Sequence, residues 1–210
     1  MTADPLHALL DAGDGVADGD ARILEAALEQ FAMTGIRKTS TDDIARRAGV
    51  NRATLYRRLG TKDDVVRAAF LFEAARVLAE IERAIDGIDD LDEYVATFFT
   101  VTVRSVRENP LLARMLHVDR DETLRSLTVG AGGVLELSAA FLTEKIVEVR
   151  ERVAAARGEP PRLDDVPALS AVLARLTQSL LLTPDGPPRL DDDGRMREFA
   201  LTVVAPMVRG

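Results

Sequence analysis

Hydrophobic residues recur along nearly the whole chain at the three- and four-residue spacing of one helix face. The first such stripe, in residues 20–33, consists of Ile23, Leu24, Ala27, Leu28 and Phe31. Comparable stripes predict further helices over residues 62–85, 91–107, 111–116, 120–129, 134–157, 164–182 and 191–208. Runs that alternate apolar and polar residues, as strands would, are missing from the sequence. The pattern therefore predicts an all-α protein.

Two short helices are predicted between Ser40 and Leu59. Ser40 is a good N-cap, and Asp43 stands where the acidic partner of a capping box would lie. Gly49 ends the first of these helices, and Asn51 can cap the second, over residues 52–59. Two short helices joined by a glycine-containing turn form a helix-turn-helix, a motif that commonly binds DNA.

The second short helix carries the chemistry expected of a recognition helix. Leu55 and Leu59 are four residues apart and anchor one face, which leaves the polar side chains available. Arginine can bind guanine with two hydrogen bonds, and small side chains permit close approach to bases. Lys62 opens the next helix, where exposed backbone N–H groups and a cation together suit a phosphate.

The stretch TSTDDIARRAGVNRATLYRRLGTKDDV, residues 39–65, strongly resembles the TetR family of bacterial transcriptional regulators. The resemblance covers roughly residues 20–70, including the preceding helix and the glycine at position 35. Two departures are conservative: Asn51 stands where the family commonly has Ser or Thr, and Leu59 where it commonly has Phe. The resemblance implies that a first set of residues touches phosphate, namely Thr39, Ser40, Thr41 and Lys62. It also implies that a second set faces the DNA groove, namely Arg52, Ala53, Thr54, Tyr56 and Arg57.

The resemblance also implies the organisation of the rest of the chain. We expect a flexible acidic tail over residues 1–19, a DNA-binding domain over 20–66, and a helical ligand-binding and dimerisation domain over 67–210. The expected function is a sequence-specific regulator, in the family's commoner mode a repressor. It would bind a palindromic operator in double-stranded DNA as a homodimer, and a small, largely apolar effector would release it.

Candidate residues can be named for both tasks of the larger domain. Those chosen for the ligand pocket are Phe98, Thr102, Arg104, Met115, His117 and Phe141. Those chosen for the dimer interface, from the broad apolar faces of the last two helices, are Leu169, Val172, Leu173, Leu176, Leu180, Phe199 and Val203. Ordinary core packing explains the same apolar spacing, so both readings stay open for each residue.

Composition narrows the remaining classes of function. The formal net charge is −8, yet residues 20–67 hold ten Lys and Arg against seven Asp and Glu. A basic segment thus lies within an acidic chain. The chain has no cysteine and two histidines, which argues against a metal site, and we expect no cofactor. We also expect no membrane span and no signal peptide, and hence a cytoplasmic protein.

Two other classes of function compete with the regulator. An enzyme is disfavoured because no catalytic constellation organises the carboxylates and hydroxyls. The glycines of residues 130–133 lack the lysine of a phosphate-binding loop, and the acids of residues 191–193 fit a helix start. The alternative to the regulator is a helical ligand-binding or interaction module without specific DNA binding, against which the set of Arg52, Tyr56, Arg57 and Lys62 argues.

Overall fold

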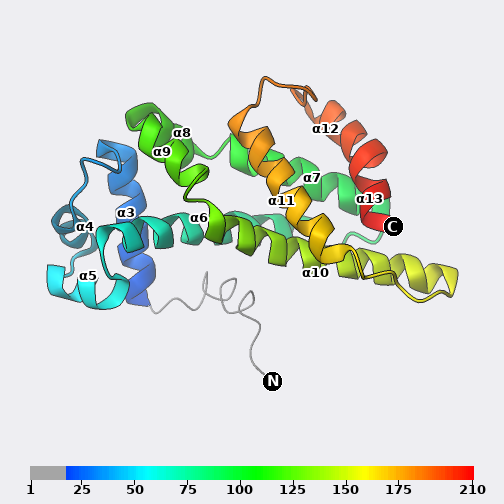
Figure 1. The fold of residues 1–210 in the computed structure, drawn as a ribbon, viewed down its shortest axis with the longest axis horizontal. Coiled ribbons are helices and arrows are strands. Elements are labelled where there is room, and N and C mark those ends of the chain that lie inside the picture. Colours follow the sequence, from blue (N-terminus) through cyan, green and yellow to red (C-terminus); the bar gives the residue numbers. More distant parts are fainter. Residues whose placement is uncertain (1–17) are drawn as a thin grey trace. The chain divides into compact units, whose positions relative to one another are not determined.

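The computed structural model describes residues 18–210, and this part of the chain is built from helices without a strand (Figure 1). The expected tail lies outside the described residues up to residue 17, and the first described helix already begins at Asp18. The elements are α3 (Asp18–Thr34), α4 (Thr41–Ala48), α5 (Arg52–Leu59), α6 (Lys62–Ile85), α7 (Leu91–Arg107), α8 (Pro110–Val118), α9 (Arg120–Leu127), α10 (Gly132–Arg157), α11 (Val166–Leu182), α12 (Asp193–Phe199), η1 (Ala200–Val204) and α13 (Ala205–Arg209). The all-α prediction is confirmed.

The helices form two compact units. The first unit holds the described residues up to Arg76 together with residues 108–134. The second holds residues 77–107 and 135–210. The first unit is therefore larger than the segment over residues 20–66 in which we expected the DNA-binding domain, because it also contains α8 and α9.

The core of the first unit is made by the stripes that the sequence predicted for α3, α4 and α5. Ile23, Phe31, Ile44 and Leu55 are fully buried and belong to one cluster. Met115 of α8 joins the same cluster, and α8 packs against α3. Burying a large aliphatic or aromatic side chain contributes about 1.5–3 kcal/mol, so these few residues hold the short α4 and α5 in place.

The core of the second unit lies between α7, α10, α11 and the C-terminal helices. Phe99 and Val103 of α7 pack with Ile146 and Val149 of α10 in one buried cluster. The predicted last helix, residues 191–208, is here three consecutive segments, with the π-helical turn η1 between α12 and α13. Pro206 lies in the first turn of α13, where a proline is tolerated, and its missing N–H accompanies the wider turn before it.

Within residues 18–210, no single helix is long and apolar enough to cross a membrane. The pair of α9 and α10, bent by 46°, has the length and composition of a span only when the two helices are taken together. Residues 18–210 also contain no group of three or more His, Cys, Asp or Glu side chains that could hold a metal ion.

Candidate nucleic-acid interface and ligand cavity

Helix α4 has a well-defined start and end. The Ser40 hydroxyl accepts a hydrogen bond from the Asp43 N–H at 3.1 Å, and the Asp43 carboxylate accepts one from the Ser40 N–H at 3.1 Å. These bonds form the predicted capping box, and the hydrogen bonds from Ser40 hold the pKa of Asp43 below its ordinary value. Gly49 closes the helix in the left-handed conformation, with φ of 65°, which a glycine adopts without strain.

Helix α5 begins at the predicted cap, where the Asn51 side-chain oxygen accepts from the Thr54 N–H at 2.7 Å. Leu55 is fully buried, and Leu59 is half-buried against the same cluster. The opposite face is open to solvent and presents Arg52, Ala53, Tyr56 and Arg57, with Thr54 half-buried beside them. The structure thus brings together on one exposed face the residues expected to meet the DNA groove.

Arg52 and Tyr56 are held by residues of α4. The Arg52 guanidinium lies 3.2 Å from the Asp42 carboxylate, donates to the Tyr56 hydroxyl at 3.3 Å, and stands 5.2 Å from the centre of the Tyr56 ring. The hydroxyls of Tyr56 and Thr41 share a hydrogen bond of 3.3 Å. The hydrogen bonds from Thr41 and Arg52 lower the pKa of Tyr56, and the bond to Tyr56 with the charge of Asp42 raises that of Arg52.

Arg57 and Arg58 are neighbours on α5 with different surroundings. Arg58 donates to the Asp20 carboxylate of α3 at 3.0 Å. Arg57 is exposed and has no hydrogen-bond or ion-pair partner among the residues that the structure describes. Arg57 is therefore the side chain of this face that can reach a base without breaking an existing contact.

The three residues expected to touch phosphate before α4 do not behave alike. Ser40 is exposed, but Thr39 and Thr41 are 2 % and 6 % exposed. The Thr39 hydroxyl donates to the Gly35 carbonyl at 2.7 Å. This is a correction to the sequence-based set: buried hydroxyls with internal partners support the loop, and of these three only the Ser40 side chain faces solvent.

Lys62 opens α6 as expected. Its ammonium donates to the Arg37 carbonyl at 3.1 Å, in the loop between α3 and α4. The Asp64 carboxylate accepts from the Thr61 N–H at 2.8 Å, and the hydrogen bonds from Thr61 lower the pKa of Asp64. The start of α6 and the loop before α4 are thereby joined on the same side of the first unit.

Sequence reasoning missed a contact between the loop after α3 and the junction of α8 and α9. The Asp119 carboxylate accepts from the Arg37 N–H at 2.9 Å and lies 3.7 Å from the Arg37 side chain. Gly35 has a φ of 85°, and a Cβ placed on it would come within 2.8 Å of the Asp119 Cβ. The sequence carries no signal for this contact, because it joins residues 82 positions apart.

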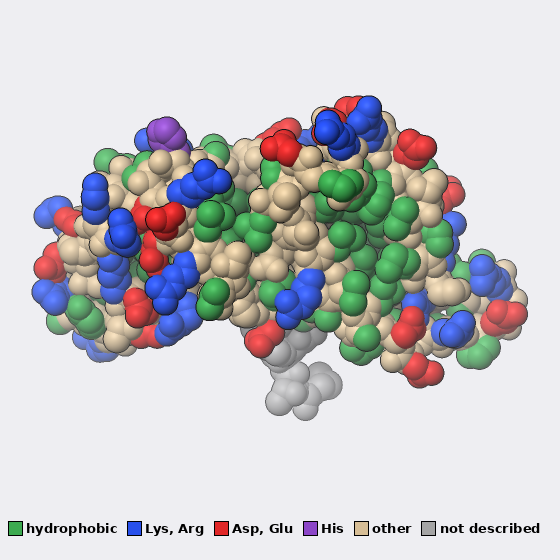
Figure 2. Space-filling view, turned by 45° about the horizontal axis from the view of Figure 1, so that its top comes forward, with side chains coloured by type: hydrophobic (Ala, Val, Ile, Leu, Met, Phe, Trp, Pro, Cys, Tyr) green, Lys and Arg blue, Asp and Glu red, His purple; other side chains and the backbone are tan. Residues whose placement is uncertain are grey.

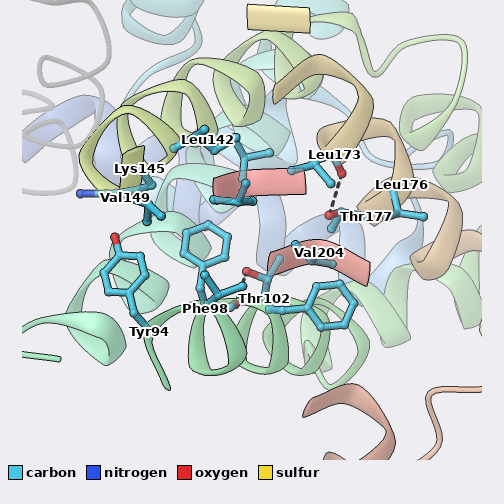
Figure 3. A pocket seen from close by; sticks show the side chains of 14 residues that line it. Tyr94, Phe98, Thr102, Leu142, Lys145, Val149, Leu173, Leu176, Thr177 and Val204 are labelled. Carbon is cyan, nitrogen blue, oxygen red and sulfur yellow. Dashed lines mark hydrogen bonds between the residues drawn. The ribbon is translucent and has the colours of Figure 1, made fainter. Parts of the chain in front are cut away.

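A cavity of about 50 Å³ lies in the second unit among α7, α10, α11 and the C-terminal helices (Figure 3). Its lining is mostly apolar: Tyr94, Val95, Phe98, Phe99, Thr102, Leu142, Lys145, Ile146, Val149, Leu173, Leu176, Thr177, Val204 and Val208. Phe98 and Thr102 were predicted to line a pocket and do so. A mostly apolar lining with few polar groups is typical of a ligand site.

The other four pocket candidates lie elsewhere. Phe141 is fully buried behind the lining and stacks on Phe98, with ring centroids 6.0 Å apart. Arg104 forms an ion pair with Asp193. Met115 and His117 do not line the cavity, because both belong to the first unit. There Met115 is part of the core and His117 is exposed, which corrects the prediction for both residues. Periodicity identified apolar faces but not the core to which each face belongs.

Lys145 was not predicted and is the charged member of the cavity lining. Its ammonium donates to the Glu82 carboxylate at 2.7 Å, lies 3.5 Å from that of Glu144, and stands 5.5 Å from the centre of the Phe141 ring. Burial alone would lower the pKa of Lys145, but the hydrogen bond to Glu82 and the charges of the neighbouring glutamates raise it above its ordinary value. The group is therefore a buried cation.

A second, more polar cavity of about 440 Å³ adjoins the first. Tyr94 and Lys145 line both cavities, and Glu82, Glu148 and Arg152 line only the polar one. The Tyr94 hydroxyl donates to the Glu148 carboxylate at 3.4 Å, and burial together with the charge of Glu148 raises the pKa of Tyr94.

The candidates for the dimer interface divide by burial. Leu173 and Leu180 are buried in the core of the second unit, and Leu169, Leu176 and Phe199 are half-buried against it. Val172 of α11 and Val203 of η1 are 56 % and 41 % exposed, and Met207 of α13 is 39 % exposed. Figure 2 shows hydrophobic side chains gathered over the C-terminal part of the molecule. Leu173 and Leu180, predicted for the interface, are thus core residues instead. The exposed apolar residues Val172, Val203 and Met207 remain as candidates for the dimer interface.

The fold and the exposed face of α5 define a helix-turn-helix protein, and comparison with known proteins agrees. Residues 23–69 match the family model described as bacterial regulatory proteins, tetR family. An uncharacterized HTH-type transcriptional regulator of Mycobacterium tuberculosis is 28 % identical over 185 residues, covering 88 % of this chain and 85 % of the relative. The HTH-type transcriptional regulator UidR of Escherichia coli K12 is 27 % identical over 160 residues, covering 76 % and 78 %.

Solved structures show the same fold. The TetR family repressor AlkX of Dietzia sp. has a TM-score of 0.66 at 18 % identity, covering 90 % of this chain and 96 % of that one. The transcriptional repressor QsdR of R. erythropolis has a TM-score of 0.61 at 21 % identity, covering 91 % and 94 %. Residues 23–69 therefore carry the helix-turn-helix of the tetR family, and the relatives that match most of the chain are helix-turn-helix transcriptional regulators.

Proposed function

We propose that the protein is a cytoplasmic repressor that binds a palindromic operator as a homodimer and is released by a small, largely apolar ligand. The observation that carries the proposal is the exposed polar face of α5, which is fixed from behind by the buried Leu55 and capped by Asn51. A recognition helix needs this combination, because its base-reading side chains must be solvent-exposed on a rigid support.

The contacts divide by chemistry. Arg57 and Arg52 are long enough to reach base edges in the major groove, where arginine prefers guanine. Ala53 and Thr54 keep the helix close to the groove floor. Three further groups suit phosphate: the exposed Ser40 and Tyr56 hydroxyls and the ammonium of the half-buried Lys62 at the start of α6.

The length of the recognition element supports a dimer. Helix α5 has eight residues and reads only a few base pairs, so specificity requires two copies on two half-sites. In a two-fold dimer the half-sites are related by the same symmetry, which makes the operator an inverted repeat. Val172, Val203 and Met207 supply an exposed apolar surface on α11 and the C-terminal helices that a second copy can cover.

Ligand release is proposed as a shift between two conformations. The walls of the cavity come from α7, α10, α11 and the C-terminal helices. Of these, α11 and the C-terminal helices also carry the surface proposed for the dimer. A ligand that fits the cavity better in one spacing of the two recognition helices moves the population towards that spacing, to the extent of its differential affinity.

The proposal is tested by selecting bound DNA from a random duplex pool with the purified full chain and sequencing the product. We expect an enriched inverted repeat whose half-site centres are about 34–36 Å apart, or a multiple of that distance. An enriched single half-site would contradict the dimer. Loss of all enrichment, with folded protein at low salt, would contradict specific DNA binding and favour a helical interaction module.

A further inference from the structure

We propose that the ligand of the apolar cavity is a molecule with a hydrocarbon body and one carboxylate, and that this carboxylate binds the Lys145 ammonium in place of Glu82. The inference rests on the proposed function, since it names the chemical class of the ligand that the regulator senses. It goes further by identifying the internal group with which the ligand competes.

The charge of the cavity wall indicates the sign of the ligand's charge. Among the fourteen residues that line the cavity, Lys145 is the one charged side chain, and no Asp or Glu belongs to the lining. The Lys145 side chain is only 11 % exposed. The Lys145 ammonium lies at the edge of the lining (Figure 3) and already contacts Glu82 and Glu144. A carboxylate ligand can therefore reach this cation by replacing Glu82, whereas an ammonium ligand would find no carboxylate within the lining to bind.

The other polar side chains of the lining already donate their hydroxyl protons to hydrogen bonds within the protein. The Thr102 hydroxyl donates to the Phe98 carbonyl at 2.7 Å, and the Thr177 hydroxyl donates to the Leu173 carbonyl at 3.1 Å, as Figure 3 shows. The Tyr94 hydroxyl donates to Glu148. Within this lining, the Lys145 ammonium is therefore the side-chain group that can donate to an incoming anion.

The present partner of Lys145 can leave without being stranded. The Glu82 side chain is 42 % exposed and lines the polar cavity, which is large enough to let the carboxylate turn into water. The exchange replaces one carboxylate on Lys145 by another, so the electrostatic change is small. Burial of the hydrocarbon body against the apolar wall then supplies the net affinity.

The exchange has a structural consequence inside the second unit. Glu82 lies on α6 and Lys145 on α10, so their hydrogen bond ties these two helices together. Bound ligand and an intact bond between Glu82 and Lys145 exclude each other. Helix α6 is the same continuous helix that starts at Lys62 directly after α5, so the released end belongs to the element that continues into the DNA-binding segment.

The size of the cavity selects the probe. One water needs roughly 10–15 Å³ of such a volume, so about 50 Å³ holds a handful of non-hydrogen atoms. The five carbons of the hexanoate chain match this size, with the carboxylate in the place that Glu82 vacates. Hexylammonium and 1-hexanol carry a hydrocarbon chain of similar length with the opposite charge or none. We expect calorimetric titration of the full chain, without DNA, to show hexanoate binding at least tenfold tighter than either analogue.

Variants of the two partners must shift the affinity in opposite directions. Lys145→Met should weaken hexanoate binding about tenfold or more, as expected for loss of a charged hydrogen bond. Glu82→Gln should strengthen it several-fold, because an amide competes poorly for the ammonium. Arg83→Gln is the matched control, because Arg83 neighbours Glu82 on α6 and lines the polar cavity but not the apolar one. The affinity of this variant for hexanoate should be unchanged.

Each other outcome overturns the inference. These are absence of hexanoate binding, equal or tighter binding of an analogue, unchanged or tighter binding by folded Lys145→Met, and weaker or unchanged binding by Glu82→Gln. Circular dichroism checks whether Lys145→Met is folded. If Lys145→Met is unfolded, the affinity of Glu82→Gln for hexanoate decides whether the inference holds. DNA selection with the same preparations separates the two proposals: a chain that selects an inverted repeat but ignores hexanoate refutes only the ligand class, and the reverse refutes only the regulator.

Discussion

The Asp42 carboxylate of α4 lies 3.2 Å from the Arg52 guanidinium of α5, so an acidic residue of the supporting helix holds a cation of the recognition helix. Both side chains are more than half exposed. A pair in this environment stabilises a protein by less than about 1 kcal/mol, and its effect on DNA binding is the larger one.

Replacing this acid should therefore strengthen DNA binding without a marked change in stability. Asp42→Asn removes a negative charge next to the phosphates and releases Arg52, so we expect a several-fold rise in affinity for any duplex at low salt. Fluorescence anisotropy across a salt series measures it. Glu25→Gln on α3 is a control for net charge, and an equal rise in both variants would show that the pair itself is unimportant.

The glycine at position 35 should be more sensitive to substitution than Gly87, which has a similar backbone conformation. Gly35→Ala adds a Cβ at a φ of 85° and within 2.8 Å of Asp119, whereas Gly87, with a φ of 73°, has open space around it. Gly35→Ala and Gly87→Ala both place an alanine in the left-handed conformation, which costs about 1–2 kcal/mol of stability. Only Gly35→Ala also displaces Asp119. Urea unfolding should show the larger loss for Gly35→Ala, and equal losses would contradict the close approach.

Arg150 joins the start of α11 to the C-terminus. It is 2 % exposed, donates to the carbonyls of Arg162 and Val208 at 2.6 and 3.0 Å, and forms an ion pair with Asp165. Arg150→Met strands these carbonyls, so we expect a loss of about 2–4 kcal/mol in unfolding free energy. Arg157→Met, at the exposed end of α10, serves as the control. A loss no greater than in this control would contradict the role of Arg150.

The same ion pair predicts a pH dependence. The hydrogen bond from Arg150 lowers the pKa of Asp165 to about 2. Because a lowered pKa in the folded state stabilises above the unfolded value of about 3.9, this contribution is complete above that pH and is lost as the pH falls towards 2. The stability difference between the wild type and Asp165→Asn should shrink over this window, and a difference that stays constant would contradict the pairing.

The proposed dimer surface can be tested by charge. Val172→Asp and Val203→Asp place a carboxylate where the second copy would bury it, so we expect monomers in light scattering and loss of operator binding. Val129 of the first unit is 87 % exposed, and Val129→Asp should leave both properties unchanged. Dimers that survive both substitutions would place the interface elsewhere.

The sequence predicted best what neighbouring residues decide. The cap at Ser40 with Asp43, the cap at Asn51 and the stop at Gly49 are local hydrogen bonds and backbone conformations, and all are present. The helix boundaries follow from such signals to within a few residues.

Long-range contacts were predicted less well. Met115 has the spacing of a pocket residue but packs in the first unit, and Thr39 has the composition of a phosphate contact but is buried. Lys145 was not predicted because a single lysine in a helix is normally solvent-exposed. Its burial depends on the partner Glu82, which lies 63 positions away in the sequence. Only the tertiary structure brings such pairs together.

The most direct test of the account compares the base preferences of two neighbouring arginines. DNA selection is repeated with Arg57→Ala and, as the matched control, Arg58→Ala, whose side chain binds Asp20 instead of facing DNA. We predict that Arg57→Ala loses preference at one base position of each half-site and about 1–3 kcal/mol of affinity, and that Arg58→Ala keeps the selected sequence. An unchanged preference in Arg57→Ala would contradict the claim that the exposed face of α5 reads the operator.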